Sequence, residues 1–152
     1  AGGADVNARR VENGQSVGVT PLFVAVGQDA PSGALVERLL KHGARVDARR
    51  AGDASTPLHW AANFGASDAV HLLLRHGADP TRRSNTGSTM FLNAIRVGQL
   101  MNVRVLLKLP TAHELLTELY DTAAEDCADC CGALHYAAQA NQTLIVRELV
   151  HA

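Results

Sequence analysis

The residues of this chain that could hold a metal ion lie in its last third. Cys127, Cys130 and Cys131 stand there within reach, along the sequence, of His113 and His135. The two-residue gap between the first two cysteines lets two thiolates meet one Zn²⁺, and either histidine could add a ligand. A spacing of four ligands is not evident, and three clustered cysteines form no disulfide framework. We interpret the cysteines as small, reduced side chains and predict no metal and no cofactor; a zinc- or redox-responsive switch is the alternative.

Catalytic motifs are incomplete. H-E-L-L-T from His113 approaches the helix of zinc proteases, but Thr117 stands where the second histidine is required. We find no phosphate-binding glycine loop and no G-x-S-x-G segment. The sequence therefore predicts a protein that is not an enzyme, with no small-molecule substrate.

The longest regular stretch reads T-P-L-H-W-A-A-N-F-G-A-S-D-A-V-H-L-L-L-R-H-G-A-D from Thr56 onward. Thr56 can cap a helix that begins at Pro57, since the missing N–H of proline would have no partner at that position. A glycine then breaks the apolar pattern, and we expect Ser67 with Asp68 to cap a second helix that Gly77 closes. The stretch predicts a helical hairpin. Its inward apolar residues would be Leu58, Ala61, Ala62, Val70, Leu73 and Leu74.

Parts of this hairpin recur along the chain at nearly equal intervals. T-P-L begins at Thr20 and again at Thr56, T-M-F follows at Thr89, and G-A-L-H-Y-A-A begins at Gly132. One hairpin cannot bury the apolar stripes of both helices, so the copies must stack. A period near 33 with T-P-L-H-x-A resembles the ankyrin-repeat family over nearly the whole length of the chain.

The resemblance implies an all-α solenoid of stacked helix-turn-helix units with finger loops, and one insertion between repeats three and four. We expect helices at 21–28 and 31–42 in repeat one and at 133–140 and 143–151 in repeat four. Thr111 can cap an extra helix in the insertion, with Leu115, Leu116 and Leu119 on one face. We divide the single domain of residues 1–152 into a tail and extended finger (1–16), repeat one (17–52), repeat two (53–86), repeat three (87–107), the insertion (108–129) and an incomplete repeat four (130–152).

Length and composition agree with this interpretation. The 152 residues are 47% hydrophobic but only 4% aromatic, which suits closely stacked alanine and leucine. Because both ends interrupt the repeat pattern, we expect an interior piece of a longer protein. No apolar run is long enough to predict a transmembrane helix, and no leader predicts secretion. The odd number of cysteines favours the cytoplasm, with the nucleus as an alternative.

Ligands of the family usually bind the concave side, which the first helix of each pair lines. By the resemblance, Val24, Trp60, Asn93 and Tyr136 face this groove, with Gln28, Phe64, Val97 and Ala140 one turn later. Trp60 and Phe64 form an i, i+4 aromatic pair, and exposed aromatic side chains are typical anchors of a partner. The alternative is that the pair covers a neighbouring helix or the insertion. We predict partner contacts for Trp60, Asn63, Phe64, Asn93, Arg96 and Tyr136.

Arginines recur in the fingers. Six residues after each closing glycine come Arg9, Arg49 and Arg83, and an arginine neighbours each of them: Arg10, Arg50 and Arg82. Stacking would align the pairs into a basic stripe able to hold carboxylates or phosphates. A basic residue is common in the family at the first position, so ordinary solvated fingers are the alternative. Aspartate is usual at the next position, and Arg10 and Arg50 depart from it.

Charge divides the chain. Residues 1–108 hold 13 lysines and arginines against 8 acids, whereas residues 109–152 hold 1 against 7. This polarity favours a protein partner with an acidic segment, or the insertion folding back on the fingers. A nearly neutral chain is not typical of a nucleic-acid binder. We predict a non-catalytic protein-binding scaffold; the alternative is a regulatory or substrate-recruiting ankyrin segment of a larger enzyme or channel.

Overall fold

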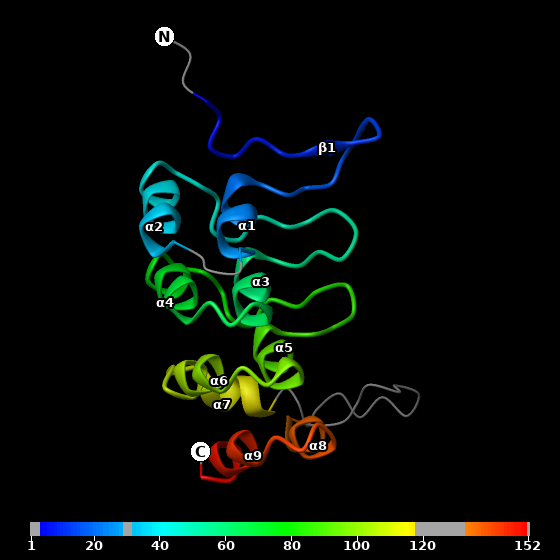
Figure 1. Ribbon diagram of the computed structural model, residues 1–152, viewed down its shortest axis with the longest axis vertical. Helices are drawn as coiled ribbons and strands as arrows, with labels where there is room; N and C mark the ends of the chain where they lie inside the picture. The colour runs from blue at the N-terminus through cyan, green and yellow to red at the C-terminus, as the bar shows by residue number, and fades with distance from the viewer. Residues whose placement is uncertain (1–3, 29–31, 118–132, 152) are drawn as a thin grey trace.

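The computed structural model describes residues 4–28, 32–117 and 133–151, and Figure 1 shows them as a stack of helical hairpins. α1, α3, α5 and α8 form one column beside the projecting loops, and α2, α4, α6 and α9 form a second column farther from them (Figure 1). This arrangement confirms the predicted all-α ankyrin solenoid. The bounds of these helices are α1 Pro21–Val26, α2 Gly33–Lys41, α3 Pro57–Asn63, α4 Ser67–Arg75, α5 Met90–Val97, α6 Leu100–Leu107, α8 Ala133–Gln139 and α9 Thr143–Val150.

The first helices of the hairpins begin where the threonines predict. Thr20, Thr56 and Thr89 occupy the N-cap positions of α1, α3 and α5, and a proline opens the first two of these helices. The Thr89 hydroxyl accepts a hydrogen bond from the backbone N–H of Leu92 at 3.4 Å. The Thr89 bond satisfies an N–H group that has no partner inside the helix, whereas the Thr20 hydroxyl makes no such bond.

Several predicted boundaries were wrong by one to two residues. α4 has Ala66 at its N-cap, because the Ala66 carbonyl already accepts the first helical bond from Val70 N–H at 2.9 Å. Ser67 is therefore the first helical residue and not the cap. α2 begins at Gly33 and not at residue 31, because the Ser32 hydroxyl caps it by accepting from the N–H of Leu35.

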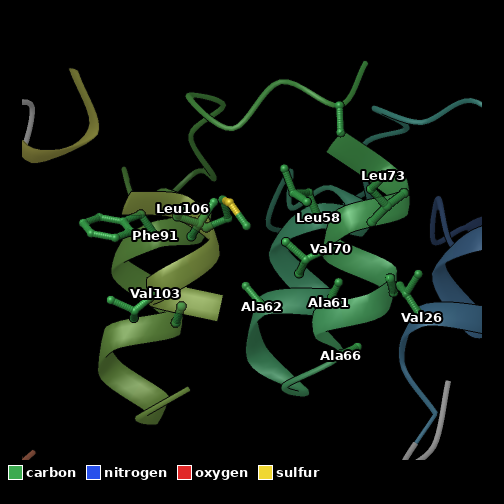
Figure 2. Close-up of a cluster of buried hydrophobic side chains, with 14 of the residues drawn as sticks. Val26, Leu58, Ala61, Ala62, Ala66, Val70, Leu73, Phe91, Val103 and Leu106 are labelled. Carbon is green, nitrogen blue, oxygen red and sulfur yellow. The ribbon is translucent and has the colours of Figure 1, made fainter. Parts of the chain in front are cut away.

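The core runs along the stack between the two columns of helices. Figure 2 shows the side chains of α3 and α4 between those of the neighbouring hairpins, with Leu58, Val70 and Leu73 pointing inward. All three are fully buried, as predicted, while Leu74 is only half-buried. Complete burial of one such side chain stabilises the fold by about 1.5–3 kcal/mol. The alanines Ala61 and Ala62 are also fully buried, and their small size lets adjacent hairpins approach closely.

The loops between hairpins, which we call the fingers, are residues 8–19, 44–55 and 79–88. In the first finger, β1 (Val11–Glu12) pairs antiparallel with β2 (Gln15–Ser16) around Asn13 and Gly14, both at positive φ. Backbone hydrogen bonds then join finger to finger: Ala51 N–H donates to Val17 O at 3.1 Å, and Asn85 N–H donates to Asp53 O at 2.8 Å. The fingers therefore form one connected edge.

Glycine and glutamine meet where consecutive hairpins stack. Gly65 has φ +69°, and a Cβ there would lie 2.8 Å from the amide carbon of Gln99 in the next repeat. The Gln99 side chain also donates to the carbonyl of Asn63 at 3.4 Å. Gly98 repeats the arrangement, since its Cβ would lie 3.0 Å from Nε2 of Gln142. The space that these glycines leave lets a polar side chain fill the junction between repeats.

A further helix, α7 (Ala112–Thr117), follows α6. It begins directly after Thr111, as predicted, and Leu115 is buried while Leu116 is half-buried against the core. Leu119 and the three cysteines lie outside the described residues, so the zinc alternative stays a prediction. None of the helices among the described residues is long and apolar enough to cross a membrane.

Candidate partner-binding surface

Trp60 links the first two repeats on the column of helices beside the fingers. Its ring is half-buried and meets the buried Phe23 ring of α1 edge-on, with 5.4 Å between centroids and an interplanar angle of 82°. A Cβ on Gly27 would lie 2.8 Å from the Trp60 ring, so only glycine admits the indole there. One side of the Trp60 ring therefore covers the neighbouring helix, as the alternative interpretation expected.

Arg50 and Phe64 contact the other parts of the same indole. The Arg50 guanidinium carbon lies 5.5 Å from the centroid of the Trp60 ring, and the Phe64 ring lies 5.9 Å from it at 54°. Cations are attracted to the electron-rich face of indole. The geometry brings the aromatic pair and the finger arginine, which the sequence suggested separately, into one cluster.

Exposed apolar side chains continue along this column. Val24 of α1, Phe64 at the end of α3 and Val97 at the end of α5 are 47%, 48% and 52% exposed. Phe64 and Val97 each lie directly before the glycine that ends the first helix of a hairpin, so they occupy equivalent positions in successive repeats. The column therefore presents apolar contact area in three neighbouring repeats.

Polar candidates surround this apolar row. Asn63 and Arg96 are exposed, whereas Asn93 and Tyr136 are half-buried. The Asn63 carbonyl accepts from Gln99, but its side-chain amide forms no hydrogen bond within the described part of the chain. Asn63 and Arg96 are accordingly the more accessible of these four residues.

Arg49 and Arg83 donate hydrogen bonds to backbone carbonyls of the fingers. An Nη2–H of Arg49 donates to the carbonyl of Arg83 at 3.1 Å, and an Nη1–H of Arg83 donates to the carbonyl of Gly87 at 3.0 Å. The first of these bonds joins consecutive repeats. Arg9 is exposed in the first finger.

The arginines beside them meet carboxylates of the same edge. Arg10 pairs with Glu12 at 2.9 Å and Arg50 with Asp53 at 3.3 Å. Arg82 lies 3.5 Å from Asp47 and 3.6 Å from Asp79, near enough for an ion pair although its Nε–H has no hydrogen-bond partner. Arg10 and Arg50 stand where aspartate is usual in the family, but Glu12 and Asp53 pair with them and reduce the net positive charge of the edge.

Two of these carboxylates, those of Asp53 and Asp79, have a lowered pKa. Partial burial alone would raise the pKa of Asp53, but hydrogen bonds from Ser55 and the charge of Arg50 outweigh it, so the pKa lies below its usual value. The hydrogen bond from Thr81 is the main cause of the lowered pKa of Asp79. Both acids therefore remain charged partners of the fingers well below neutral pH.

The two motif histidines differ. His59 is buried, and its Nδ1 accepts from the N–H of Thr56 at 3.3 Å, so the other nitrogen, Nε2, carries the proton and donates to the carbonyl of Ser88 at 3.1 Å. Burial is the main cause of its lowered pKa. His135 occupies the corresponding position of α8, where its side chain is exposed.

A cavity of about 570 Å³ lies between the first two fingers. Its lining includes the polar side chains of Glu12, Gln15, Arg50 and Asp53 from both fingers. Such a lining suits the backbone of an extended peptide, which offers N–H and carbonyl groups in turn. Asn13, which also lines the cavity, and the following Gly14 were not singled out from the sequence, although Asn-Gly is the strongest short hairpin signal.

The described residues include no candidate metal-binding site. No group of three histidines, cysteines or acids among residues 4–28, 32–117 and 133–151 could hold an ion. The side chains of His113 and Thr117, from the near-motif of zinc proteases, lie outside what is described.

Comparison with known proteins matches the repeats. The family model for ankyrin repeats (three copies) matches residues 2–84 and 22–114. Over 66 residues the chain is 44% identical to the human 2-5A-dependent ribonuclease, covering 43% of the chain and 9% of that relative. It is 48% identical over 56 residues to the Caenorhabditis elegans homologue of transient receptor potential cation channel subfamily A member 1, and 31% identical over 104 residues to the Drosophila Notch protein. The chain thus spans under a tenth of the length of these relatives.

Proposed function

The chain belongs to the ankyrin-repeat family, and from that premise we propose that it is a non-catalytic module that binds a protein segment across its concave groove and fingers. Repeats of this family generally mediate protein–protein interaction. We place the binding surface on the helices beside the fingers, centred on Phe64 and the outer edge of Trp60.

One observation carries the proposal: a half-exposed phenylalanine stands beside a tryptophan that is itself covered by an arginine. Aromatic rings and arginine supply most of the energy at protein interfaces, because they bury large areas with few rotatable bonds. Trp60 is held in place by Phe23, so a partner that covers Phe64 has little ordering entropy to overcome there.

An acidic segment in the partner fits the edge of the fingers. Arg9 and Arg49 are exposed, and Arg10 and Arg50 share their charge with one acid each. A carboxylate from a partner would compete with Glu12 and Asp53 for these arginines. Charges of this kind mainly raise the association rate, and salt weakens their effect.

The experiment selects displayed peptides on the wild-type chain and titrates the enriched peptides while following Trp60 fluorescence. We expect Phe64→Ala to weaken their binding by roughly 2 kcal/mol, or about 30-fold. Leu144→Ala, which removes an exposed apolar side chain of α9, should change it less than twofold. Equal effects of both substitutions would contradict the proposed surface.

A second measurement addresses the arginines. Replacing Arg10 and Arg50 with Asp should slow association and flatten its dependence on ionic strength, while the far-UV circular dichroism stays that of the wild type. Association rates that respond neither to the substitutions nor to salt would reduce the arginines to ordinary surface.

The alternative is a regulatory or substrate-recruiting segment of a larger enzyme or channel. It is supported by the relatives, which include a ribonuclease and a cation channel of which this chain would be a small part. The name of the ribonuclease states a dependence on 2-5A, so 2-5A should be titrated in the same fluorescence assay. The sequence beyond residue 152 would decide between a separate scaffold and an enzyme segment. For either, we propose the cytoplasm or the nucleus.

A further inference from the structure

A second surface lies away from the fingers, between α4 and α6 in the other column of helices (Figure 1). A cavity of about 590 Å³ opens there between repeats two and three. We call it the outer groove. Its apolar lining consists of Leu74, Met101, Val105 and Leu109.

The apolar side chains form a continuous floor. Leu74, Val105 and Leu109 are half-buried against the core, so their positions are fixed by packing. Met101 is 58% exposed, far more than the buried methionine of the chain, Met90. Exposed methionine is common at binding surfaces, because its flexible and polarisable side chain adapts to different shapes.

Among the described residues, the charged side chains that line the groove are all cations, Arg75, Arg104 and Lys108, and His71 lies beside them. Arg104 is already engaged, since two of its N–H groups donate to Glu148 of α9 at 2.9 and 2.7 Å. The lowered pKa of Glu37 is caused mainly by its hydrogen bond with Lys41 at 2.8 Å, and Arg75 adds only a weaker effect of its charge.

Two cations therefore remain available. Within the described part of the chain, the side chains of Arg75 and Lys108 are exposed and form no hydrogen bond or ion pair, although the charge of Arg75 acts weakly on Glu37. Arg75 ends α4, and Lys108 directly follows α6, so cations stand at the carboxyl ends of both helices that form the groove.

The lining residues share one face of each of the two helices. On α6 and its end they lie at positions 101, 104, 105 and 108, and on α4 at 71, 74 and 75, which is the i, i+3, i+4 spacing of one helix face. Each face alternates apolar and basic side chains. A helix that lies between the two faces would meet an apolar floor and cations at its flanks.

We propose that the outer groove binds an amphipathic helix of a partner protein, with apolar residues on one face and Asp or Glu on the flanks. The apolar face covers Met101, and the acids pair with Arg75 and Lys108. This site is separate from the proposed concave surface, so one chain could hold two partners at once.

The chain contains natural reporters for the two surfaces. It has two methionines and one tryptophan. In ¹³C-methyl-labelled protein, the Met101 signal reports on the outer groove, the Met90 signal reports on the core, and Trp60 fluorescence reports on the concave side.

The experiment uses a displayed library of short amphipathic helices, half with acidic flanks and half with basic flanks. The library is selected on the wild-type chain and counter-selected on the Arg75→Glu, Lys108→Glu double variant. We expect acidic-flanked peptides that shift Met101 and leave Met90 and Trp60 unchanged. The double variant should weaken them at least tenfold, and Arg38→Glu, an exposed arginine of α2 outside the groove, less than twofold.

Three results would overturn the proposal. The first is that the selection yields no acidic-flanked peptide that binds the wild type more tightly than the double variant. The second is an equal loss of affinity with Arg38→Glu, which would indicate unspecific attraction. The third is binding to vesicles of phosphatidylserine and phosphatidylcholine that depends on Arg75 and Lys108 while no peptide does, which would assign the groove to a lipid surface.

Discussion

Replacing Trp60 with Ala removes the ring through which repeats one and two meet, and we expect it to lower the free energy of unfolding by about 3 kcal/mol. Truncating a fully buried tryptophan or phenylalanine costs about 3–5 kcal/mol. Trp60 is half-buried, so only part of that area applies, roughly 2 kcal/mol. The edge contact with Phe23 adds about 1 kcal/mol. A cavity would also remain beside Gly27, which the indole fills at present.

Phe64 is the matched comparison. It contacts the same indole but is 48% exposed and caps the end of α3. We expect Phe64→Ala to cost about 1 kcal/mol, the size of one aromatic pair, and to act mainly on binding. The two substitutions therefore separate a residue that joins repeats from a residue that meets a partner.

Urea unfolding followed by far-UV circular dichroism measures both variants, since Trp60 is the only tryptophan and its fluorescence is lost with it. Equal losses for Trp60→Ala and Phe64→Ala, or a loss below about 1 kcal/mol for Trp60→Ala, would refute the assignment of Trp60 to the junction between repeats.

Three further predictions concern stability. Gly65→Ala should cost about 1–3 kcal/mol in urea unfolding, and more than Gly77→Ala, because both have positive φ but only Gly65 faces Gln99; equal costs would mean that the contact is unimportant. Asn102→Ala should cost about 1–3 kcal/mol, since this buried side chain donates to the last carbonyls of α3 at 3.2 and 3.4 Å; a loss under about 0.5 kcal/mol would contradict this. The pKa of His59 lies below the ordinary 6.5, so the unfolded chain binds more protons and stability should fall as pH drops below about 6.5, levelling off below the folded pKa. His59→Gln should remove this part of the pH dependence. If the free energies of unfolding of wild type and variant, measured in urea between pH 8 and about 5, differ by the same amount at every pH, His59 does not cause it.

Much of the fold could be predicted because the signals are local and repeated. A threonine followed by proline sets the first helix of a hairpin, and glycine at positive φ closes the second, so Thr56 and Gly77 were placed correctly. Ser67 was wrongly predicted as the N-cap because serine is a common N-cap residue. The carbonyl of Ala66 accepts the first hydrogen bond of the helix, so Ala66 is the N-cap. A cap residue in the sequence predicts the end of a helix to within one turn, but the first backbone hydrogen bond determines at which residue the helix begins.

The candidate site was less predictable, because it depends on contacts between repeats. Nothing near Arg50 in the sequence indicates that its guanidinium lies over Trp60, or that Arg82 meets Asp47 from the preceding finger. The outer groove had no signal at all, since each helix contributes a face of mixed apolar and basic residues that is unremarkable by itself. Only stacking brings two such faces together.

The Gly65–Gln99 contact restricts how such arrays can exchange parts. Gln99 belongs to one repeat, and the glycine that admits it belongs to the repeat before. Recombination that exchanges a single repeat separates the two, and the new neighbour keeps its spacing only if it also offers a residue without Cβ. Hybrid arrays in which Gly65 and Gln99 come from the same parent should fold more readily than hybrids whose join falls between these two residues.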